Sequence, residues 1–313
     1  MIDDFIKYAK SNHLGKCQEN VSIKTLTTYK CGGNAKCVFY PKDVDKLIDA
    51  LKYLNSNNIL HMVIGNGSNL LFSDHEYDGV LIKLSELNYM KVFRNKLTAG
   101  AGYSLVKLAY DAYKNSLTGL EFASGIPGTV GGAIYMNAGA YLSDMGYVTE
   151  SVKVLTPEYQ VITMTNKEMD FHYRTSFLKT HPGYICLEAT IKLKKGKQEA
   201  IKAVMDDRKQ RRLSSQPLEY PSAGSVFRNP EGQSAGKLID DLHLKGLTKG
   251  GAQVSNKHAN FIVNIGNAKS SDVMELIVFV HDTVAENYDI DLSCEQEFVN
   301  WEKKNGESKE EEN

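Results

Sequence analysis

GIPGTVGGAIYMNAGA, residues 125–140, contains five glycines and one proline in sixteen positions. Glycine weakens the interior of helices and strands, so such a cluster indicates unusual backbone angles or close approach of the backbone to a ligand. A second glycine-containing loop, GNGSNLL at 65–71, follows a short apolar strand expected at 59–65. Its successive N–H groups predict a concave nest of the kind that binds anions. Together the two loops predict a shared cradle for a dinucleotide.

Neither loop matches one of the common nucleotide motifs. Position 70 is leucine where the Rossmann fingerprint needs its third glycine, and the chain has no GK[ST] tripeptide of a Walker loop. Taken alone, GNGSNLL is also typical of an ordinary tight turn. The predicted ligand site therefore depends on both loops together.

The overall composition narrows the partners of the chain. Its 313 residues are 42% hydrophobic and 24% charged, with a formal net charge of −1, so we expect no nucleic acid among its partners. No apolar run is long enough for membrane insertion. Five cysteines without a CxxC pair favour reduced thiols and a cytoplasmic location. No HExxH motif or Cys/His cluster indicates a metal, and no obligate protein partner is evident.

Helix and strand patterns are intermixed along the chain. Apolar spacing predicts helices over 44–55, 104–117 and 270–288, the first capped by Asp43 and the last by Ser270 or Ser271. Alternating residues predict hairpins over 90–101 and 151–165. The charged residues 196–215 are typical of a helix with a solvated face. We therefore predict an α+β fold rather than a doubly wound parallel sheet.

Several motifs in a fixed order carry a resemblance to a known family. TLTTYKCGGNA (25–35), GNGSNLL and SGIPGTVGGAIYMNAGAY (124–141) resemble the vanillyl-alcohol-oxidase-type (PCMH-type) FAD fold. The match continues through FHYRTSF (171–177), SAGSVFRNP (222–230), SAGKLID (234–240) and GGAQVSNKHANFIVN (250–264). The full set, over roughly residues 20 to 300, resembles the shorter branch of the UDP-N-acetylenolpyruvoylglucosamine reductase family.

The resemblance implies reduction of UDP-N-acetylglucosamine enolpyruvate to UDP-N-acetylmuramate through bound FAD, with NADPH as co-substrate, in peptidoglycan synthesis. With the compositional shift at 196–215 taken as the domain boundary, we predict an N-terminal helix at 1–20, a two-subdomain FAD-binding domain at 21–200 and a smaller α+β substrate-binding domain at 201–301. The polar, charged composition of residues 302–313 predicts a disordered tail. The expected FAD contacts are Gly32, Gly33, Gly65, Asn66, Gly67, Ser68, Asn69, Ser124, Gly125, Pro127, Gly128, Thr129, Gly131, Gly132 and Ala133.

The resemblance also implies the residues of the reaction. Arg174 is the expected cation for the carboxylate and enolate oxygens, Ser225 occupies the proton-donor position, and Glu295 the position of the catalytic glutamate. The expected substrate contacts are Tyr173, Asn229 and Lys257. From the residues alone, Asn229 is equally typical of a turn before a proline, and Tyr173 of simple packing.

The C-terminal strand departs from the family pattern. The family reads close to LEPEVRxxG, whereas this chain has LSCEQEFVN at 292–300. In a regular strand Glu297 lies on the same face as Glu295, so either carboxylate is a candidate for the catalytic position. Two other functions stay open: another flavin-dependent oxidoreductase of the same fold, and a non-catalytic nucleotide-sugar-binding protein, which only this altered strand supports.

Overall fold

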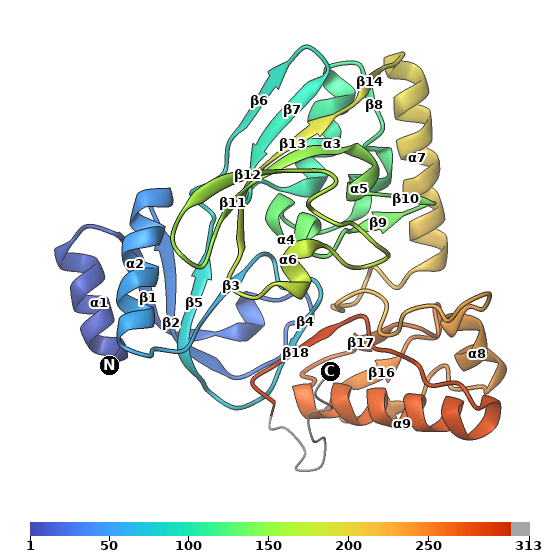
Figure 1. The fold of residues 1–313 in the computed structure, drawn as a ribbon. Coiled ribbons are helices and arrows are strands. Elements are labelled where there is room, and N and C mark those ends of the chain that lie inside the picture. The colour runs from blue at the N-terminus through green and yellow to red at the C-terminus, as the bar shows by residue number, and fades with distance from the viewer. Residues whose placement is uncertain (302–313) are drawn as a thin grey trace, which may run out of the picture.

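A four-stranded sheet begins the computed structural model, which describes residues 1–301 (Figure 1). The strand order is β1 (Gly15–Ser22), β2 (Asn34–Pro41), β5 (Tyr77–Lys83), β3 (His61–Ile64), antiparallel at β1–β2 and otherwise parallel. Side chains of β2 alternate between its two faces: Phe39 packs with the helices and Val38 with the opposite layer. The helices against which Phe39 packs are α1 (Ile2–Ser11) and α2 (Val44–Ser56). The predicted cap of α2 is confirmed, because the Asp43 carboxylate accepts the Lys46 N–H at 2.9 Å.

The N-terminal helix predicted over 1–20 is wrong in length. Helix α1 ends at Ser11, and the following residues form β1, which pairs with β2 from Gly15 to Ser22. Only the first turns carry an amphipathic helical face, which buries Phe5 and Ala9. The charged tail predicted over 302–313 lies outside the described residues.

A five-stranded antiparallel sheet forms the second layer, in the order β12–β11–β13–β7–β6. Both predicted hairpins are confirmed, as β6 (Met90–Phe93) with β7 (Lys96–Gly100) and β11 (Thr149–Leu155) with β12 (Val161–Thr165). The central strand is β13 (Ile185–Lys192). The other elements of this part are η1 (Ile23–Thr25), β4 (Leu70–Phe72), α3 (Leu105–Lys114), β8 (Leu117–Thr118), η2 (Glu121–Gly125), α4 (Val130–Tyr135), β9 (Gly139–Ala140), β10 (Ser143–Asp144), α5 (Met145–Val148), α6 (Phe177–Thr180) and β14 (Lys194–Lys195).

The C-terminal part has its own hydrophobic core. Helix α7 (Gln198–Ser215) leads into it, running down one side of the molecule in Figure 1 and contacting η2 and α3. Its further elements are α8 (Ala235–Asp241), β15 (Thr248–Lys249), β16 (Ala252–Val254), β17 (Ile262–Asn264), α9 (Ser270–Tyr288) and β18 (Glu297–Val299). The domain boundary at 200/201 stays a prediction, since α7 runs through it. No helix within residues 1–301 is both long and apolar enough to cross a bilayer.

The N-terminus of α9 is capped from outside the C-terminal part. Neither predicted serine cap is correct: the helix begins at Ser270, and the N–H groups of Ser270 and Ser271 donate to the Asp74 carboxylate at 2.8 and 2.9 Å. Asp272 closes the first turn by accepting the Lys269 N–H at 2.9 Å. An acidic group at a helix N-terminus is favoured by the exposed N–H groups and the helix dipole. Asp74, in the loop between β4 and β5, therefore fastens the C-terminal part to the N-terminal part.

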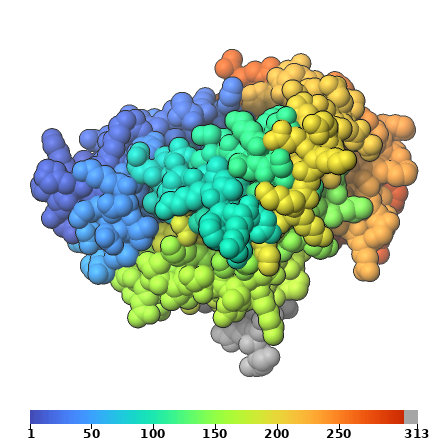
Figure 2. Space-filling view, turned by 90° about the horizontal axis from the view of Figure 1, so that it is seen from above, coloured from blue at the N-terminus to red at the C-terminus, as the bar shows by residue number. Residues whose placement is uncertain are grey.

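The last strand returns to the N-terminal part. β18 pairs in parallel with β4, and the Trp301 indole N–H donates to the Leu71 carbonyl at 2.9 Å. In the ribbon the C-terminal chain runs back alongside β4 from the layer of α9 (Figure 1). Seen from above, the N-terminal and C-terminal segments occupy opposite ends of the molecule, with the second sheet's residues between them (Figure 2). The predicted α+β fold is confirmed by these mixed layers.

Candidate functional site

A cavity of about 1110 Å³ lies where the two sheets meet the C-terminal part. Its volume exceeds the range of about 300–1,000 Å³ usual for small-ligand sites, so it has room for more than one small molecule. Its wall draws on the glycine loop at 65–69, on α4 with the loop before it, and on residues 222–225. These segments are far apart in the sequence and meet only in the folded chain.

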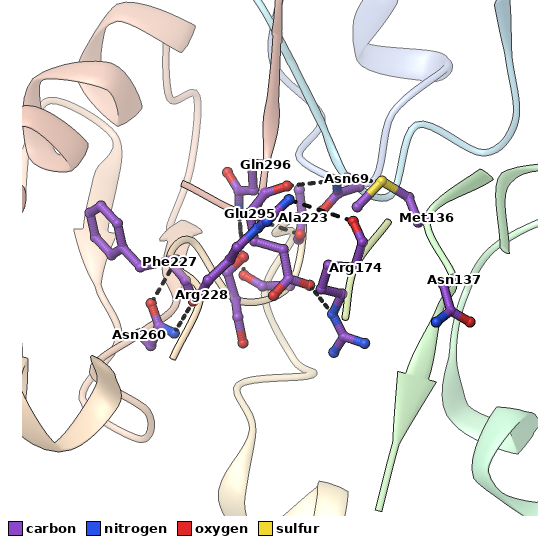
Figure 3. A network of polar contacts seen from close by, with 12 residues as sticks. Asn69, Met136, Asn137, Arg174, Ala223, Phe227, Arg228, Asn260, Glu295 and Gln296 are labelled. Carbon is purple, nitrogen blue, oxygen red and sulfur yellow. Dashed lines mark hydrogen bonds and ion pairs between the residues drawn. The ribbon is translucent and has the colours of Figure 1, made fainter. Parts of the chain in front are cut away.

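Arg174 forms the positive group of this cavity. Its Nε–H donates to Glu295 Oε1 at 2.7 Å, and the exposed fractions of the two side chains are 21% and 13% (Figure 3). The two residues are 121 positions apart in the sequence. Arg174 has a left-handed backbone with φ of 55°, in a tight turn closed by reciprocal hydrogen bonds between His172 and Thr175. Such strain is found at functional positions held by their surroundings. Its terminal amino groups make no hydrogen bond within residues 1–301, and Arg174 is one of the residues that line the cavity.

Glu295 is held by backbone contacts to both parts of the molecule. Its N–H donates to the Val226 carbonyl at 2.8 Å, and its carbonyl accepts from Asn69 Nδ2 at 3.0 Å. The neighbouring Gln296 is buried and donates from its side chain to the carbonyls of residues 223–225 (Figure 3). The predicted strand over this segment is therefore divided: only 297–299 form β18, while 293–295 pair with 226–228. Arg174 pairs with Glu295, and Glu297 pairs elsewhere.

Ser225 lies in the loop that lines the same cavity. Its side chain is half-buried, and its hydroxyl has no hydrogen-bond partner in the part of the chain that the structure describes. The fold thus brings together, around one cavity, all three residues predicted to be catalytic.

The two glycine segments lie side by side, as the predicted cradle requires. Asn66 Nδ2 donates to the Pro127 carbonyl at 3.2 Å, across 61 positions of sequence. A Cβ added at Gly128 would meet nothing nearer than Ser68 Oγ at 3.9 Å, so its backbone faces open space. Eleven of the predicted FAD contacts line the cavity: Gly65, Asn66, Gly67, Ser68, Asn69, Pro127, Gly128, Thr129, Gly131, Gly132 and Ala133.

Known proteins that resemble this chain decide its family. The UDP-N-acetylenolpyruvoylglucosamine reductase of Anoxybacillus flavithermus is 46% identical over 288 residues, which cover 92% of this chain and 95% of that protein. The chain belongs to the UDP-N-acetylenolpyruvoylglucosamine reductase family. The reductase of Bacillus subtilis is 42% identical over 300 residues, covering 95% of this chain and 99% of the relative. The predicted resemblance is confirmed.

Domain and structure matches agree with this reductase family. The family model described as "FAD binding domain" matches residues 35–165, and the one described as "UDP-N-acetylenolpyruvoylglucosamine reductase, C-terminal domain" matches residues 216–299. The crystal structure of the reductase from Thermus caldophilus superimposes with a TM-score of 0.79 at 35% identity, over 91% of this chain and 99% of that one.

The cavity of this family member suits a large polar cofactor such as FAD. Four buried polar atoms of wall residues have no hydrogen-bond partner within residues 1–301: Thr28 Oγ1, Arg212 Nε, Gln216 Oε1 and Glu297 Oε1, the last of which forms an ion pair with Lys179. Buried polar groups of native proteins are normally paired, so these atoms indicate that a ligand with its own donors and acceptors completes the site. The open space over Gly128 lies in the same wall.

Four predicted cofactor residues lie outside the cavity. Gly32 has φ of 115°, a backbone conformation that favours glycine, and a Cβ at Gly33 would clash with the His75 carbonyl oxygen. Ser124 donates to the Glu121 carbonyl at 2.9 Å. Together with Gly125, it lines a smaller cavity of about 230 Å³ against α7. Their sequence patterns could not separate tight packing from ligand approach, because both favour small residues.

The predicted substrate contacts also lie outside the cavity. Asn229 accepts the Ala235 N–H at 3.1 Å, so its side chain serves the start of α8. Lys257 donates to the Leu213 carbonyl at 2.6 Å. Tyr173 is 54% exposed and stacks under the Arg174 guanidinium, with 5.2 Å between the ring centroid and Cζ. These three residues belong to family motifs in the sequence, but none of them lines the cavity.

Sequence reasoning missed several charged residues of the wall. Lys83 donates to the Gly65 carbonyl at 2.8 Å, and burial lowers the pKa of its ammonium group. Burial also lowers the pKa of Arg212, which projects inward from the charged helix expected to be a solvated face. A lone lysine inside the apolar run GVLIKLS was the available signal for Lys83. Lys179 and Tyr135 belong to the same wall.

Proposed function

We propose that this chain reduces UDP-N-acetylglucosamine enolpyruvate to UDP-N-acetylmuramate in peptidoglycan precursor synthesis, with FAD as cofactor and NADPH as hydride donor. The family membership and the FAD-binding domain support the proposal. The observation that carries it is the convergence of Arg174, Ser225 and Glu295 on one cavity beside the two glycine segments. Overall, a hydride from NADPH and one proton add across the enolpyruvyl double bond, and NADP⁺ is released.

The glycine segments are the proposed cofactor cradle. FAD, when bound, supplies the redox chemistry by accepting a hydride from the nicotinamide and returning it to the substrate carbon. The backbone at Gly128 and at residues 65–69 gives close approach without side chains in the way. Thr28 and Arg212 offer donors that have no partner within residues 1–301.

Arg174 is the proposed anion-binding residue of the reaction. Its two free amino groups match the geometry of a carboxylate, and a guanidinium also stabilises negative charge that develops on an enolate oxygen. Glu295 fixes the orientation of the guanidinium through Nε. The second carboxylate oxygen of Glu295 makes no hydrogen bond within residues 1–301 and stays available to support proton transfer.

Ser225 is the proposed proton donor to the substrate carbon. A positioned general acid contributes about 10²- to 10⁴-fold to a rate. A hydroxyl is a weak acid, so the alkoxide needs a neighbouring cation or acid. Arg174 and Glu295, in the same cavity, meet that need.

The purified protein tests the proposal directly. It should carry a yellow flavin spectrum, lose the colour with NADPH under anaerobic conditions, and regain it on addition of the enolpyruvyl nucleotide sugar. Reduction without reoxidation by that sugar would favour another oxidoreductase of the fold, and no reduction at all a non-catalytic binding protein. The retained contact between Arg174 and Glu295 counts against the latter.

The five cysteines are free thiols, which supports the proposed cytoplasmic location.

A further inference from the structure

A second ion pair lies in the cavity wall near Arg174. The Lys179 ammonium is 2.9 Å from Glu297 Oε1, and the exposed fractions of these side chains are 18% and 24%. The Tyr135 hydroxyl lies 3.5 Å from the other carboxylate oxygen as a donor. Burial, with Glu297 alongside, raises the pKa of Tyr135 to about 12 and keeps that donor protonated. All three side chains line the cavity.

The Lys179 ammonium uses few of its donors within the protein. An ammonium carries three N–H groups. The only hydrogen bond that this one makes within residues 1–301 is to the Met136 sulphur, at 3.4 Å, which is a weak acceptor. Its contact with Glu297 has the distance of an ion pair without the alignment of a hydrogen bond. A mostly buried cation with unused donors is costly unless another group completes it.

The surroundings of Lys179 indicate which kind of group could complete it. Glu297 N–H donates to the Asn69 carbonyl at 2.9 Å, so the ion pair adjoins the glycine loop, while Met136 follows directly on α4. Arg174 lies on the same segment as Lys179, five positions earlier. The ammonium thus contacts residues that adjoin the proposed cofactor cradle, in the cavity that Arg174 also lines. Both ligands of that region carry anionic oxygens.

We propose that Lys179 is a second anion-binding residue of this site, whose ammonium donates to a phosphate or carboxylate oxygen of a bound ligand. Glu297 pairs with the ammonium and competes with the ligand for it. The inference rests on the proposed function, because FAD and the enolpyruvyl nucleotide sugar are the ligands that would supply the anion. The competing explanation is a purely fastening role, in which the pair only ties β18 to α6.

Two substitutions with different expected effects on ligand affinity separate these roles. Lys179→Met should weaken the binding of one ligand by about tenfold or more, the change expected for one hydrogen bond to a charged group. Glu297→Gln should leave the affinity for that ligand unchanged or tighten it, because it frees the ammonium. A fastening role predicts weaker binding in both variants, with a matching loss of thermal stability. Lys179→Arg, which keeps the charge, should stay close to the unmodified protein.

Two titrations distinguish the source of the anion. Dilution of the holoenzyme, followed by the fluorescence of released FAD, gives the cofactor Kd. Titration of the oxidised holoenzyme with the enolpyruvyl nucleotide sugar, without NADPH, gives the substrate Kd from the change in flavin absorbance. A shift in only one Kd assigns the anion to that ligand. Unchanged Kd values for both ligands in Lys179→Met, or weaker binding in Glu297→Gln, would overturn the inference.

A matched control and a reference assay complete the design. Lys245→Met breaks an ion pair of similar length, 2.7 Å to Asp240 Oδ2, that lies outside the cavity, and should change neither Kd. Reoxidation of the NADPH-reduced unmodified protein by the nucleotide sugar tests the proposed function separately. If that reaction is absent, the proposed function fails, whatever the Lys179 variants show. If it is present, the Kd values alone decide whether Lys179 binds a ligand anion.

Discussion

Glu295→Gln tests whether Glu295 only orients the Arg174 guanidinium or also supports proton transfer. The substitution keeps the shape and an acceptor oxygen for Arg174 Nε–H, now at 2.7 Å from Oε1, but removes the charge. A hydrogen bond to a charged group contributes about 1.5–3 kcal/mol and a neutral one about 0.5–1.5 kcal/mol. The difference, about 1–1.5 kcal/mol, corresponds to roughly a 5- to 13-fold loss if Glu295 only orients the guanidinium.

A larger loss is expected, because Glu295 lines the cavity and its second carboxylate oxygen makes no hydrogen bond within residues 1–301. Loss of a group that supports general acid catalysis costs about 10²-fold or more. Stopped-flow measurement of flavin absorbance separates the two half-reactions. We expect reduction by NADPH at a near-normal rate and reoxidation by saturating nucleotide sugar slowed by at least about 10².

Glu297→Gln is the internal control, since that carboxylate pairs with Lys179 instead of Arg174. It should slow the saturated reoxidation rate far less than Glu295→Gln does. A loss of only about tenfold in Glu295→Gln would reduce Glu295 to an orienting residue. A greater loss at Glu297 than at Glu295 would refute the assignment of the catalytic position altogether.

Three further predictions concern the proton donor, the cradle and the junction between the two parts. Ser225→Ala should slow only the substrate-driven half-reaction, by about 10² or more; equal slowing of both halves would make the serine structural. Gly128→Ala should keep the native circular dichroism spectrum but release FAD more readily on dilution. Gly131→Ala should instead lower Tm through overpacking of about 1–3 kcal/mol, because its Cβ would lie 2.9 Å from that of Ala101. The reverse pattern would show that the proposed position of the cofactor beside Gly128 is wrong. Asp74→Asn should cost about 1 kcal/mol of unfolding free energy in denaturant titrations at pH 7. Burial raises the pKa of Asp74, but hydrogen bonds from the N–H groups of α9 outweigh it and lower the pKa, so the stabilisation is present above the ordinary carboxyl pKa and is lost as pH falls through the lowered pKa. A loss of stability that does not depend on pH would contradict this prediction.

Local patterns in the sequence were sufficient for the elements whose stability is local. The helix over Val44–Ser56 and its Asp43 cap follow from apolar spacing and one side-chain hydrogen bond within four residues. The hairpin at Met90–Gly100 follows from alternation around a short turn. The cap of α9 did not follow, because its acceptor, Asp74, lies 196 positions away from Ser270.

The ordered motifs in the sequence also determined the family, and with it the cavity-lining triad of Arg174, Ser225 and Glu295. Composition could not separate Gly128 from Gly131: each is a glycine in one segment, yet only Gly131 packs against Ala101 while Gly128 faces open space. Likewise, the partners of Glu295 and Glu297 depend on where two cations more than a hundred positions away come to lie. The order of the residues is thus sufficient to establish which chemical groups are present and to which family the chain belongs. Only the tertiary structure decided which groups meet, because contact distances between remote segments are set by the packing of the whole chain.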